Sequence, residues 1–403
     1  MVKFRPFNGL LPSLASNETI LDRISPPYDV IEKSELTELQ NKPYNVARIT
    51  LGGVGGSYEK ASKELQDWIA RRALVRDRNE SFYLYIQAFR VGRRRYARTG
   101  LIGLLGLEEY GRGEIIPHEE TMSKVKEDRL NLLRATSTHT ESILGLFQDL
   151  GDLTPEVLHR SSQQLFECED PSGTVHSISR ISDSDMIERI SETMRNNNVL
   201  IADGHHRYET AMRYSREAPE EMGRSWVLAT LACSKDPGVL VFPTHRILKA
   251  PKVGEKDVIG TMKSRFEMTS VSSAKSLERS LKRTSKPSLG IIFRSGNVFK
   301  VELAKYDGGD PIWEIDSYVF QEVMLNKILY SLAKPEDVHI DYDHDLSSVE
   351  RKMDSGAHDI AVLLRSPRLE TIWKLAAAGR RMPKKTTYFW PKVWSGFVMH
   401  RME

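Results

Sequence analysis

The sequence predicts an α+β protein, and three features of its pattern indicate this class. Two apolar, β-rich segments at 82–89 and 98–107 flank an Arg-rich turn, a helical pattern follows at 120–135, and strands alternate with helices after about residue 237. The 403 residues are enough for two or three domains. We expect three parts: a β-rich N-terminal extension over 1–115, a core over 116–240 and a C-terminal α/β lobe over 241–403.

The spacing of apolar residues predicts the individual elements. In the first helix, Ala61, Leu65 and Trp68 recur at helical spacing, and Ile187, Ile190 and Met194 do so in a later one. Helices are predicted at 57–73, 120–135, 184–196, 205–216, 275–284, 315–333 and 368–379. Strands are predicted at 82–89, 98–107, 199–202, 238–242, 289–295, 298–303 and 359–364. A turn-rich stretch at 234–256 favours a domain boundary there.

Composition excludes several classes of protein. Lys and Arg total 58 against 55 Asp and Glu, so a net charge of +3 gives no argument for a nucleic-acid or membrane partner. With only Cys168 and Cys233, a disulfide scaffold is not expected. Apolar runs are too short for a membrane span, and MVKFRPFNGLLPSLASN lacks the apolar stretch of a signal peptide. We expect a cytoplasmic protein, either a monomer or a homodimer.

The first candidate site is Pro117-His118-Glu119 and the helix that follows. Glu119 stands at or just before the helix start. There a carboxylate either caps the positive end of the helix or acts as a base at a strand-to-helix junction. Three polar residues follow on one helix face: Thr121, Lys124 and Asp128. They form a solvated face in the structural interpretation and an accessory part of the site in the functional one.

The second candidate site is the run from Val199 to Tyr208. An apolar strand, a glycine and a helix start supply unpaired backbone N–H groups, which favour an anion. Three side chains add donors: His205, His206 and Arg207. Adjacent histidines on a helix point about 100° apart, so a shared zinc is not expected. The structural alternative is a surface helix that carries three donors by chance.

Two further segments carry groups suited to anions. The C-terminal segment Met382–Lys392 places two lysines before two hydroxyls, at Lys384, Lys385, Thr386 and Thr387. This arrangement suits phosphate oxygens, and an exposed basic loop is the alternative. A weaker candidate is His245 with Arg246, for which a structural strand end is the favoured interpretation. The sequence contains no Walker, G-x-S-x-G or G-x-G-x-x-G motif.

These motifs together resemble a known family. Asp203 to Tyr208, with the strand before it, resembles the phosphate-binding box of the ParB/sulfiredoxin superfamily. The chain is similar to archaeal free L-serine kinases of that fold, with three segments in the same order: Pro117-His118-Glu119, Asp203 to Arg207, and Met382 to Thr387. Its Pro-Pro-Tyr-Asp start and Tyr-Phe-Trp-Pro-Lys end also resemble a widespread family known as a domain of unknown function. Compared with those kinases, this chain has a longer N-terminal part and a longer separation between the first two segments.

The resemblance implies a ParB/sulfiredoxin-like nucleotide-binding core and a role for each matching residue. Glu119 would take the proton from an acceptor hydroxyl, and His118 would orient the acceptor or a phosphate. Asp203 would hold the acceptor amine or a Mg²⁺ ion. The remaining residues would bind the phosphates: Gly204, His205, His206 and Arg207, with Lys384, Lys385, Thr386 and Thr387 from the C-terminal part.

The expected function is therefore a nucleotide-dependent kinase of a small hydroxylated metabolite, with free L-serine as the first candidate. The resemblance implies ATP or ADP as the phosphate donor, with Mg²⁺. The alternative is a ParB-like nucleotide-binding regulator without metabolite turnover. No helix-turn-helix pattern or basic recognition face supports DNA binding by such a regulator.

Overall fold

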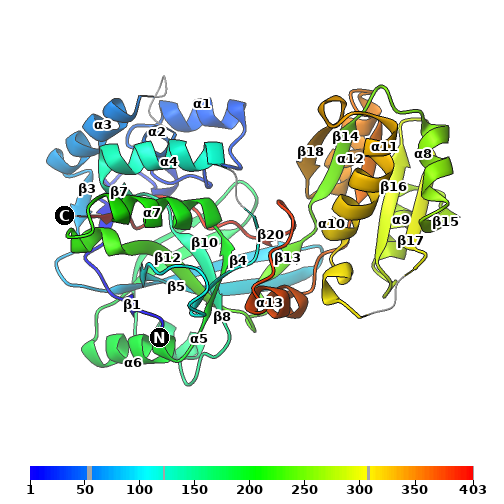
Figure 1. Ribbon diagram of the computed structural model, residues 1–403. Helices are drawn as coiled ribbons and strands as arrows, with labels where there is room; N and C mark the ends of the chain where they lie inside the picture. The colour runs from blue at the N-terminus through cyan, green and yellow to red at the C-terminus, as the bar shows by residue number, and fades with distance from the viewer. Residues whose placement is uncertain (52–56, 121–122, 306–308, 403) are drawn as a thin grey trace. The chain divides into compact units, whose positions relative to one another are not determined.

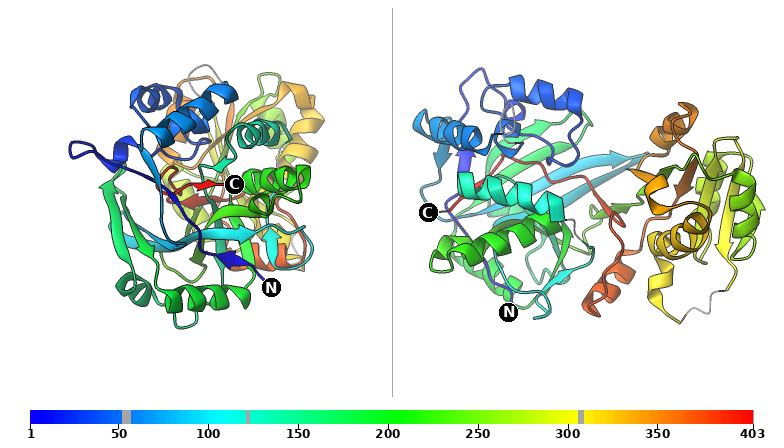
Figure 2. Two further views of the ribbon diagram at one scale, coloured as in Figure 1. Left: turned by 90° about the vertical axis from the view of Figure 1, so that its left-hand side faces the viewer. Right: turned by 45° about the horizontal axis from the view of Figure 1, so that its top comes forward.

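The computed structural model describes residues 1–51, 57–120, 123–305 and 309–402, and it divides into two compact units (Figure 1). Unit 1 consists of Met1–Pro117, Thr121–Leu240 and Pro391–Glu403. Unit 2 consists of His118–Glu120 and Val241–Trp390. Both chain ends therefore belong to unit 1, as Figures 1 and 2 mark.

Unit 1 is built on one large mixed sheet. Its strands follow the order β6 (Ile115–Pro117), β11 (Val199–Asp203), β8 (Ile143–Phe147), β12 (Trp226–Cys233), β5 (Arg94–Gly106), β4 (Phe82–Val91), β10 (Val175–Ile181) and β9 (Gln163–Glu169). A further strand, β1 (Phe4–Arg5), pairs with β5. Two pairs are parallel, β6 with β11 and β8 with β12, and the other pairs are antiparallel.

One face of this sheet carries the main core of unit 1, and we call it the core face. Alternate strand residues form it, because successive side chains of a strand point to opposite sides. Its members include Phe82, Leu84, Leu101, Leu105, Ile143, Phe147, Val199, Ile201, Val227, Ala229 and Leu231. Three helices bury apolar side chains in the same cluster: α5 (Pro155–Arg160), α6 (Ser184–Arg195) and α7 (His205–Glu217). Helices α6 and α7 were predicted, α6 from its apolar spacing, and both are confirmed.

The other helices of unit 1 lie outside this main cluster. They are α1 (Lys33–Asn41), α2 (Ala47–Thr50), α3 (Tyr58–Ala70) and α4 (Ser123–Thr136). Leu65 and Trp68 of α3 pack with Leu132 of α4, and α4 in turn contacts α7. Two short strand pairs complete the unit: β2 (Leu10–Pro12) with β3 (Leu74–Arg76), and β7 (Thr138–His139) with β21 (His400–Arg401).

Unit 2 has its own antiparallel sheet. The order is β15 (Phe266–Ser270), β17 (Val298–Leu303), β16 (Ser288–Phe293), β19 (Ile360–Leu363), β14 (His245–Lys249) and β18 (His339–Asp343). Its helices include α8 (Glu255–Met262), α9 (Ala274–Leu281), α12 (Leu346–Asp354) and α13 (Leu369–Ala377). The helix expected at 315–333 is instead α10 (Asp316–Val319), a π-helical stretch η4 (Phe320–Leu329) and α11 (Tyr330–Leu332).

The α+β class predicted from the sequence is confirmed, whereas the division of the chain differs from the three expected parts. Residues 1–115 do not separate from 116–240, because β4 and β5 from the first range pair with β10 and β12 from the second. Residues 118–120 were expected in the core but belong to unit 2. Residues 391–403 were expected in the C-terminal lobe but belong to unit 1. In the described part of the chain, no helix is long and apolar enough to span a membrane.

Two buried histidines of unit 1 predict a loss of stability in acid. Burial lowers the pKa of His139 to about 4 and that of His400 to about 3, and the charges of His139, Arg5 and Arg76 also act on His400. The unfolded chain binds these protons near pH 6.5, whereas the folded protein binds them only at much lower pH. The free energy of unfolding should therefore fall as the pH drops from about 6.5 to 4, by at most about 1.4 kcal/mol per pH unit for each histidine.

Urea unfolding at a series of pH values measures this slope. The variant His400→Phe keeps a ring and removes one titrating group, so its slope should be smaller than that of the wild type. His159 is exposed, and His159→Phe serves as the matched control that should leave the slope unchanged. If the free energy of unfolding changed equally with pH in wild type and His400→Phe, the lowered pKa of His400 would be contradicted.

Candidate functional site

The second candidate segment forms a strand–glycine–helix junction in unit 1. Strand β11 ends at Asp203, Gly204 takes the left-handed conformation with φ of 92°, and α7 begins at His205. Gly204 offers no side-chain cap to the helix. The backbone N–H groups of the first helical turn therefore remain outside the helix's own hydrogen bonds, as the prediction of an anion site requires.

The geometry gives a second reason for glycine at position 204. A Cβ atom there would lie 2.9 Å from Ile143 Cγ2 and 3.1 Å from the Arg207 guanidinium. Gly204→Ala should therefore lower the free energy of unfolding by at least about 1–2 kcal/mol, the cost of a left-handed non-glycine residue. Chemical denaturation measures the change.

Gly260 provides the matched control for this substitution. It lies inside α8, and a Cβ atom there would meet nothing within 4 Å. Gly260→Ala is expected to raise stability by about 0.5–1 kcal/mol, because alanine suits a helix interior better than glycine. If Gly204→Ala were as stable as the wild type, the left-handed turn would not be required.

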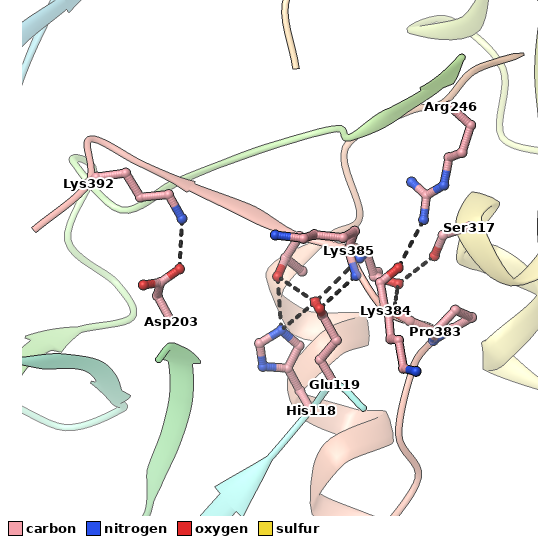
Figure 3. Close-up of polar contacts among 11 residues, drawn as sticks. His118, Glu119, Asp203, Arg246, Ser317, Pro383, Lys384, Lys385 and Lys392 are labelled. Atoms are coloured by element: carbon pink, nitrogen blue, oxygen red, sulfur yellow. Dashed lines mark hydrogen bonds and ion pairs between the residues drawn. The ribbon is translucent and has the colours of Figure 1, made fainter. Parts of the chain in front are cut away.

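Asp203 lies between two cations of unit 1. Its Oδ1 pairs with Lys392 Nζ at 2.7 Å (Figure 3), and its Oδ2 pairs with Arg207 Nη2 at 2.8 Å. The side chains of Asp203, Lys392 and Arg207 are 21%, 10% and 11% exposed. Burial by itself would raise the pKa of Asp203, but Lys392 and Arg207 hold that pKa well below its usual range. The carboxylate is therefore ionised and fully engaged.

Arg207 also has protein partners for its guanidinium. Its Nη1 donates to the Ser142 carbonyl at 2.6 Å, next to the ion pair with Asp203. Burial disfavours the charged form, but the carboxylates of Glu141 and Asp203 raise the pKa of Arg207 above its usual value. Glu141 is itself held by the Tyr28 N–H at 3.1 Å and the Ser395 hydroxyl at 3.0 Å. The box is therefore a network of fixed, paired charges, in which the cations Lys392 and Arg207 are balanced by the carboxylates of Asp203 and Glu141.

The residues present do not fit a Mg²⁺ ion held by the protein. Magnesium bound by proteins takes oxygen ligands, chiefly carboxylates and phosphates. Both oxygens of Asp203 already pair with Lys392 and Arg207. Within the described ranges, no group of three or more His, Cys, Asp or Glu side chains could hold a metal. We therefore derive no step from Asp203 as a metal ligand.

The first and third candidate segments meet within unit 2, at the loop Pro383–Thr387 (Figure 3). The Lys385 N–H donates to Glu119 Oε1 at 2.6 Å, and the Thr386 N–H donates to Glu119 Oε2 at 3.3 Å. Lys385 has φ of 58°. A left-handed residue in such a turn aims consecutive N–H groups at one anion. The loop predicted to bind a phosphate thus binds the carboxylate of Glu119 in this structure.

A short chain of polar groups continues from this carboxylate. The Thr387 hydroxyl donates to Glu119 Oε2 at 3.4 Å and lies 2.9 Å from His118 Nε2. His118 is fully buried, whereas the Glu119 side chain is 16% exposed. Burial raises the pKa of Glu119 above its usual value, and the N–H and charge of Lys385 only partly offset it. A carboxylate of raised pKa in a fixed position is suited to accept a proton.

Other contacts hold the loop in shape. The Thr386 hydroxyl donates to the Pro383 carbonyl at 2.6 Å and lies 2.6 Å from the Ser317 hydroxyl, so its hydrogen bonds are internal. Arg246 Nη2 donates to the Lys384 carbonyl at 3.3 Å, and burial lowers the pKa of Arg246 to about 10, so it stays cationic at neutral pH. The side chains of Lys384 and Lys385 are exposed.

The accessory residues have structural partners or are not among the residues and side chains that the structure describes. His245 is at the start of β14 and accepts a hydrogen bond from the Leu364 N–H at 3.1 Å, as the structural interpretation expects. Asp128 pairs with Arg129 at 2.5 Å and accepts from the Tyr58 hydroxyl at 2.6 Å. Thr121 lies outside the described residues, and so does the side chain of Lys124.

Sequence reasoning missed three residues of these networks: Lys392, Glu141 and Ser317. Lys392 was visible as the end of the C-terminal motif, but nothing local pairs it with Asp203. Glu141 and Ser317 belong to no motif, and they act only through contacts distant along the chain.

Comparison with known proteins gives one family and several distant structures. A family described as protein of unknown function (DUF1015) matches residues 4–319. No curated protein matches the chain. A conserved hypothetical protein from Pyrococcus furiosus is 16% identical, with a TM-score of 0.39 over 70% of this chain and 89% of that one. A free serine kinase in complex with AMP is 14% identical, with a TM-score of 0.39 over 68% and 83% of the two chains.

SbnI with a C-terminal truncation, from Staphylococcus aureus, is 10% identical, with a TM-score of 0.38 over 74% of this chain and 86% of that one. TM-scores below 0.5 at these identities do not identify an activity. The family model matches most of the chain, so family membership follows from that match and not from the similar structures.

Proposed function

This chain belongs to the DUF1015 family, and from that premise we propose that it is a nucleotide-dependent kinase acting on the hydroxyl of a small metabolite. Free L-serine is the first acceptor to test, with ATP or ADP as the donor. The proposal assigns the phosphate-binding part of unit 1, within 116–240, to a ParB/sulfiredoxin-like core. It rests on the chemistry of Glu119 and its partners within unit 2.

The observation that carries the proposal is the position of the Glu119 carboxylate. Two backbone N–H groups and one hydroxyl fix its oxygens, and burial raises its pKa. An aliphatic hydroxyl hardly ionises at neutral pH, so phosphoryl transfer to it benefits from a placed base. A carboxylate that only capped a helix would not need three donors from a loop distant in sequence.

In the proposed reaction, the acceptor oxygen attacks the terminal phosphorus of the nucleotide. The new O–P bond forms as the bond to the leaving ADP or AMP breaks, and the hydroxyl proton passes to Glu119. The positive end of the α7 dipole is suited to phosphate oxygens. In phosphoryl transfer this electrostatic stabilisation carries most of the catalysis.

The direct test is product formation by the full-length protein. Purified protein is incubated with L-serine, Mg²⁺ and either ATP or ADP, and O-phosphoserine is measured by mass spectrometry. A panel of other small hydroxylated metabolites is run in parallel. We expect a phosphorylated product with at least one donor. No product from any acceptor with either donor would overturn the proposal.

A nucleotide-binding regulator is the second candidate, because the start of α7 and the charge network around Asp203 lie wholly within unit 1 and do not involve Glu119. If the protein is such a regulator, calorimetry should detect nucleotide binding in both the wild type and Glu119→Gln, and neither protein should turn over a metabolite. Arg207→Lys, which keeps the charge but loses the two-pronged geometry, should weaken that binding.

A further inference from the structure

Unit 1 contains a cavity that takes no part in the site described above. Its volume is about 510 Å³, within the range of small-molecule pockets. It lies where the parallel strands β8 and β12 end: Phe147 and Cys233 are their last residues, and both line it. Crevices at the carboxyl ends of parallel strands are a frequent position for ligands.

The walls of this cavity continue the core face of the sheet. β5 contributes Ala97, Thr99 and Leu101, which alternate along the strand and so point to one side. Leu231 of β12 and Leu158 of α5 add further apolar surface. These leucines belong to the packed core, which thus forms an apolar floor for the cavity that an apolar ligand would cover.

The polar groups of the cavity carry an excess of negative charge. Three acidic residues line it, Asp149, Glu156 and Asp236, against one basic residue, Lys235. Asp236 is fixed by the Thr99 N–H at 2.9 Å and the Gly238 N–H at 2.7 Å. Burial raises the pKa of Asp236, so a cation beside it would favour its ionised form.

This cavity is separate from the network around Asp203. Asp203 pairs with Leu144, near the beginning of β8, whereas the cavity is lined by Phe147 at the end of that strand. Three residues of a strand span about 10 Å. The two sites therefore lie toward opposite ends of β8.

We propose that this cavity binds a small apolar molecule carrying a cationic amino group, with the apolar part against Leu101, Leu158 and Leu231 and the amine at Asp236. The charge of the lining selects the amine over a carboxylate, and the apolar walls select it over a polar cation. The site is independent of the proposed kinase reaction, so its test needs no enzymatic activity.

Cys233 provides a reporter inside the cavity. In a Cys168→Ser protein it is the remaining thiol, because the chain has two cysteines. Its modification by methyl methanethiosulfonate is followed by intact-protein mass spectrometry with hexylamine, hexanol or hexanoate present. We expect hexylamine to slow the modification at least about tenfold at saturation, and at lower concentrations than either of the other compounds.

Two variants test the contacts. Ala97 is exposed at the rim, so Ala97→Trp should fill the cavity without disturbing the fold and should abolish protection by hexylamine. Asp236→Asn should weaken hexylamine binding about 10–100-fold, as expected for loss of a charged hydrogen-bond partner. Glu188→Gln, which removes an exposed charge of α6 outside the cavity, is the matched control and should bind as the wild type does.

Three results would overturn the proposal. They are the absence of protection by hexylamine, equal protection by hexylamine and hexanoate, and unchanged protection in Ala97→Trp. Calorimetric titration of hexylamine into Ala97→Trp and the parent protein gives the same comparison without chemical modification.

Discussion

Glu119→Gln is expected to lower the rate of product formation by about 10²–10⁴-fold, the range typical for loss of a general base. Glutamine has nearly the same shape as glutamate but cannot accept the hydroxyl proton. The rate should fall mainly in kcat, because the carboxylate acts on the proton in the transition state. Steady-state kinetics with the nucleotide and acceptor found in the product assay measure the effect.

Glu120 offers the matched control, since it is the next residue, carries the same charge and is exposed. Glu120→Gln should keep the wild-type rate. In Glu119→Gln an NH₂ group replaces one carboxylate oxygen and cannot accept the hydrogen bond that the N–H of Lys385 or Thr386 donates there. A thermal unfolding measurement on Glu119→Gln therefore tests whether the loop has rearranged. A stable Glu119→Gln protein with wild-type kcat would exclude Glu119 as the base.

Asp203→Ala is expected to cost about 3–5 kcal/mol of the free energy of unfolding, which is the largest stability effect among these predictions. The change leaves Lys392 and Arg207 largely buried with their shared carboxylate removed. Lys392→Met should cost less, because Asp203 then keeps Arg207 as a partner. Urea unfolding of both variants measures the difference.

The double variant Asp203→Ala/Lys392→Met measures the interaction energy between the two side chains. Its cost should be smaller than the sum of the two single costs, because the second change removes the charge that the first leaves unpaired. The pKa of Asp203 is lowered in the folded protein, so its contribution is present above about pH 4 and is lost as the pH falls further. Strictly additive costs would show that the two side chains do not interact.

Much of the local structure followed from the sequence. The helix at 184–196 and the strand–glycine–helix junction at 199–216 were predicted within a residue or two of α6, β11 and α7. Each depends on interactions between residues only a few positions apart, such as helical spacing and the left-handed turn at Gly204. Helices α1, α8 and α12 were not predicted, and at 315–333 most of the predicted α-helix is a π-helix.

The candidate residues were also visible as local patterns, but their partners were not. The lysines and hydroxyls of the Pro-Lys-Lys-Thr-Thr segment were predicted to bind phosphate oxygens, which stays a prediction, and two backbone N–H groups of the segment hold an anion of the protein itself. The anion is Glu119, which lies 266 positions earlier in the chain. Asp203 was expected to hold the acceptor amine or a Mg²⁺ ion, and its carboxylate pairs with Arg207 and with Lys392, which is 189 positions away.

The sequence by itself determined the α+β class, the position of its main helices and strands, and the junctions where charged groups gather, because these depend on the periodicity and conformational preferences of neighbouring residues. Only the tertiary structure decided that residues 118–120 join unit 2 and that residues 391–403 return to unit 1. It also decided which cation neutralises Asp203 and which N–H groups hold Glu119. The physical reason is that such pairings join residues hundreds of positions apart, and their geometry exists only once each unit has packed its core.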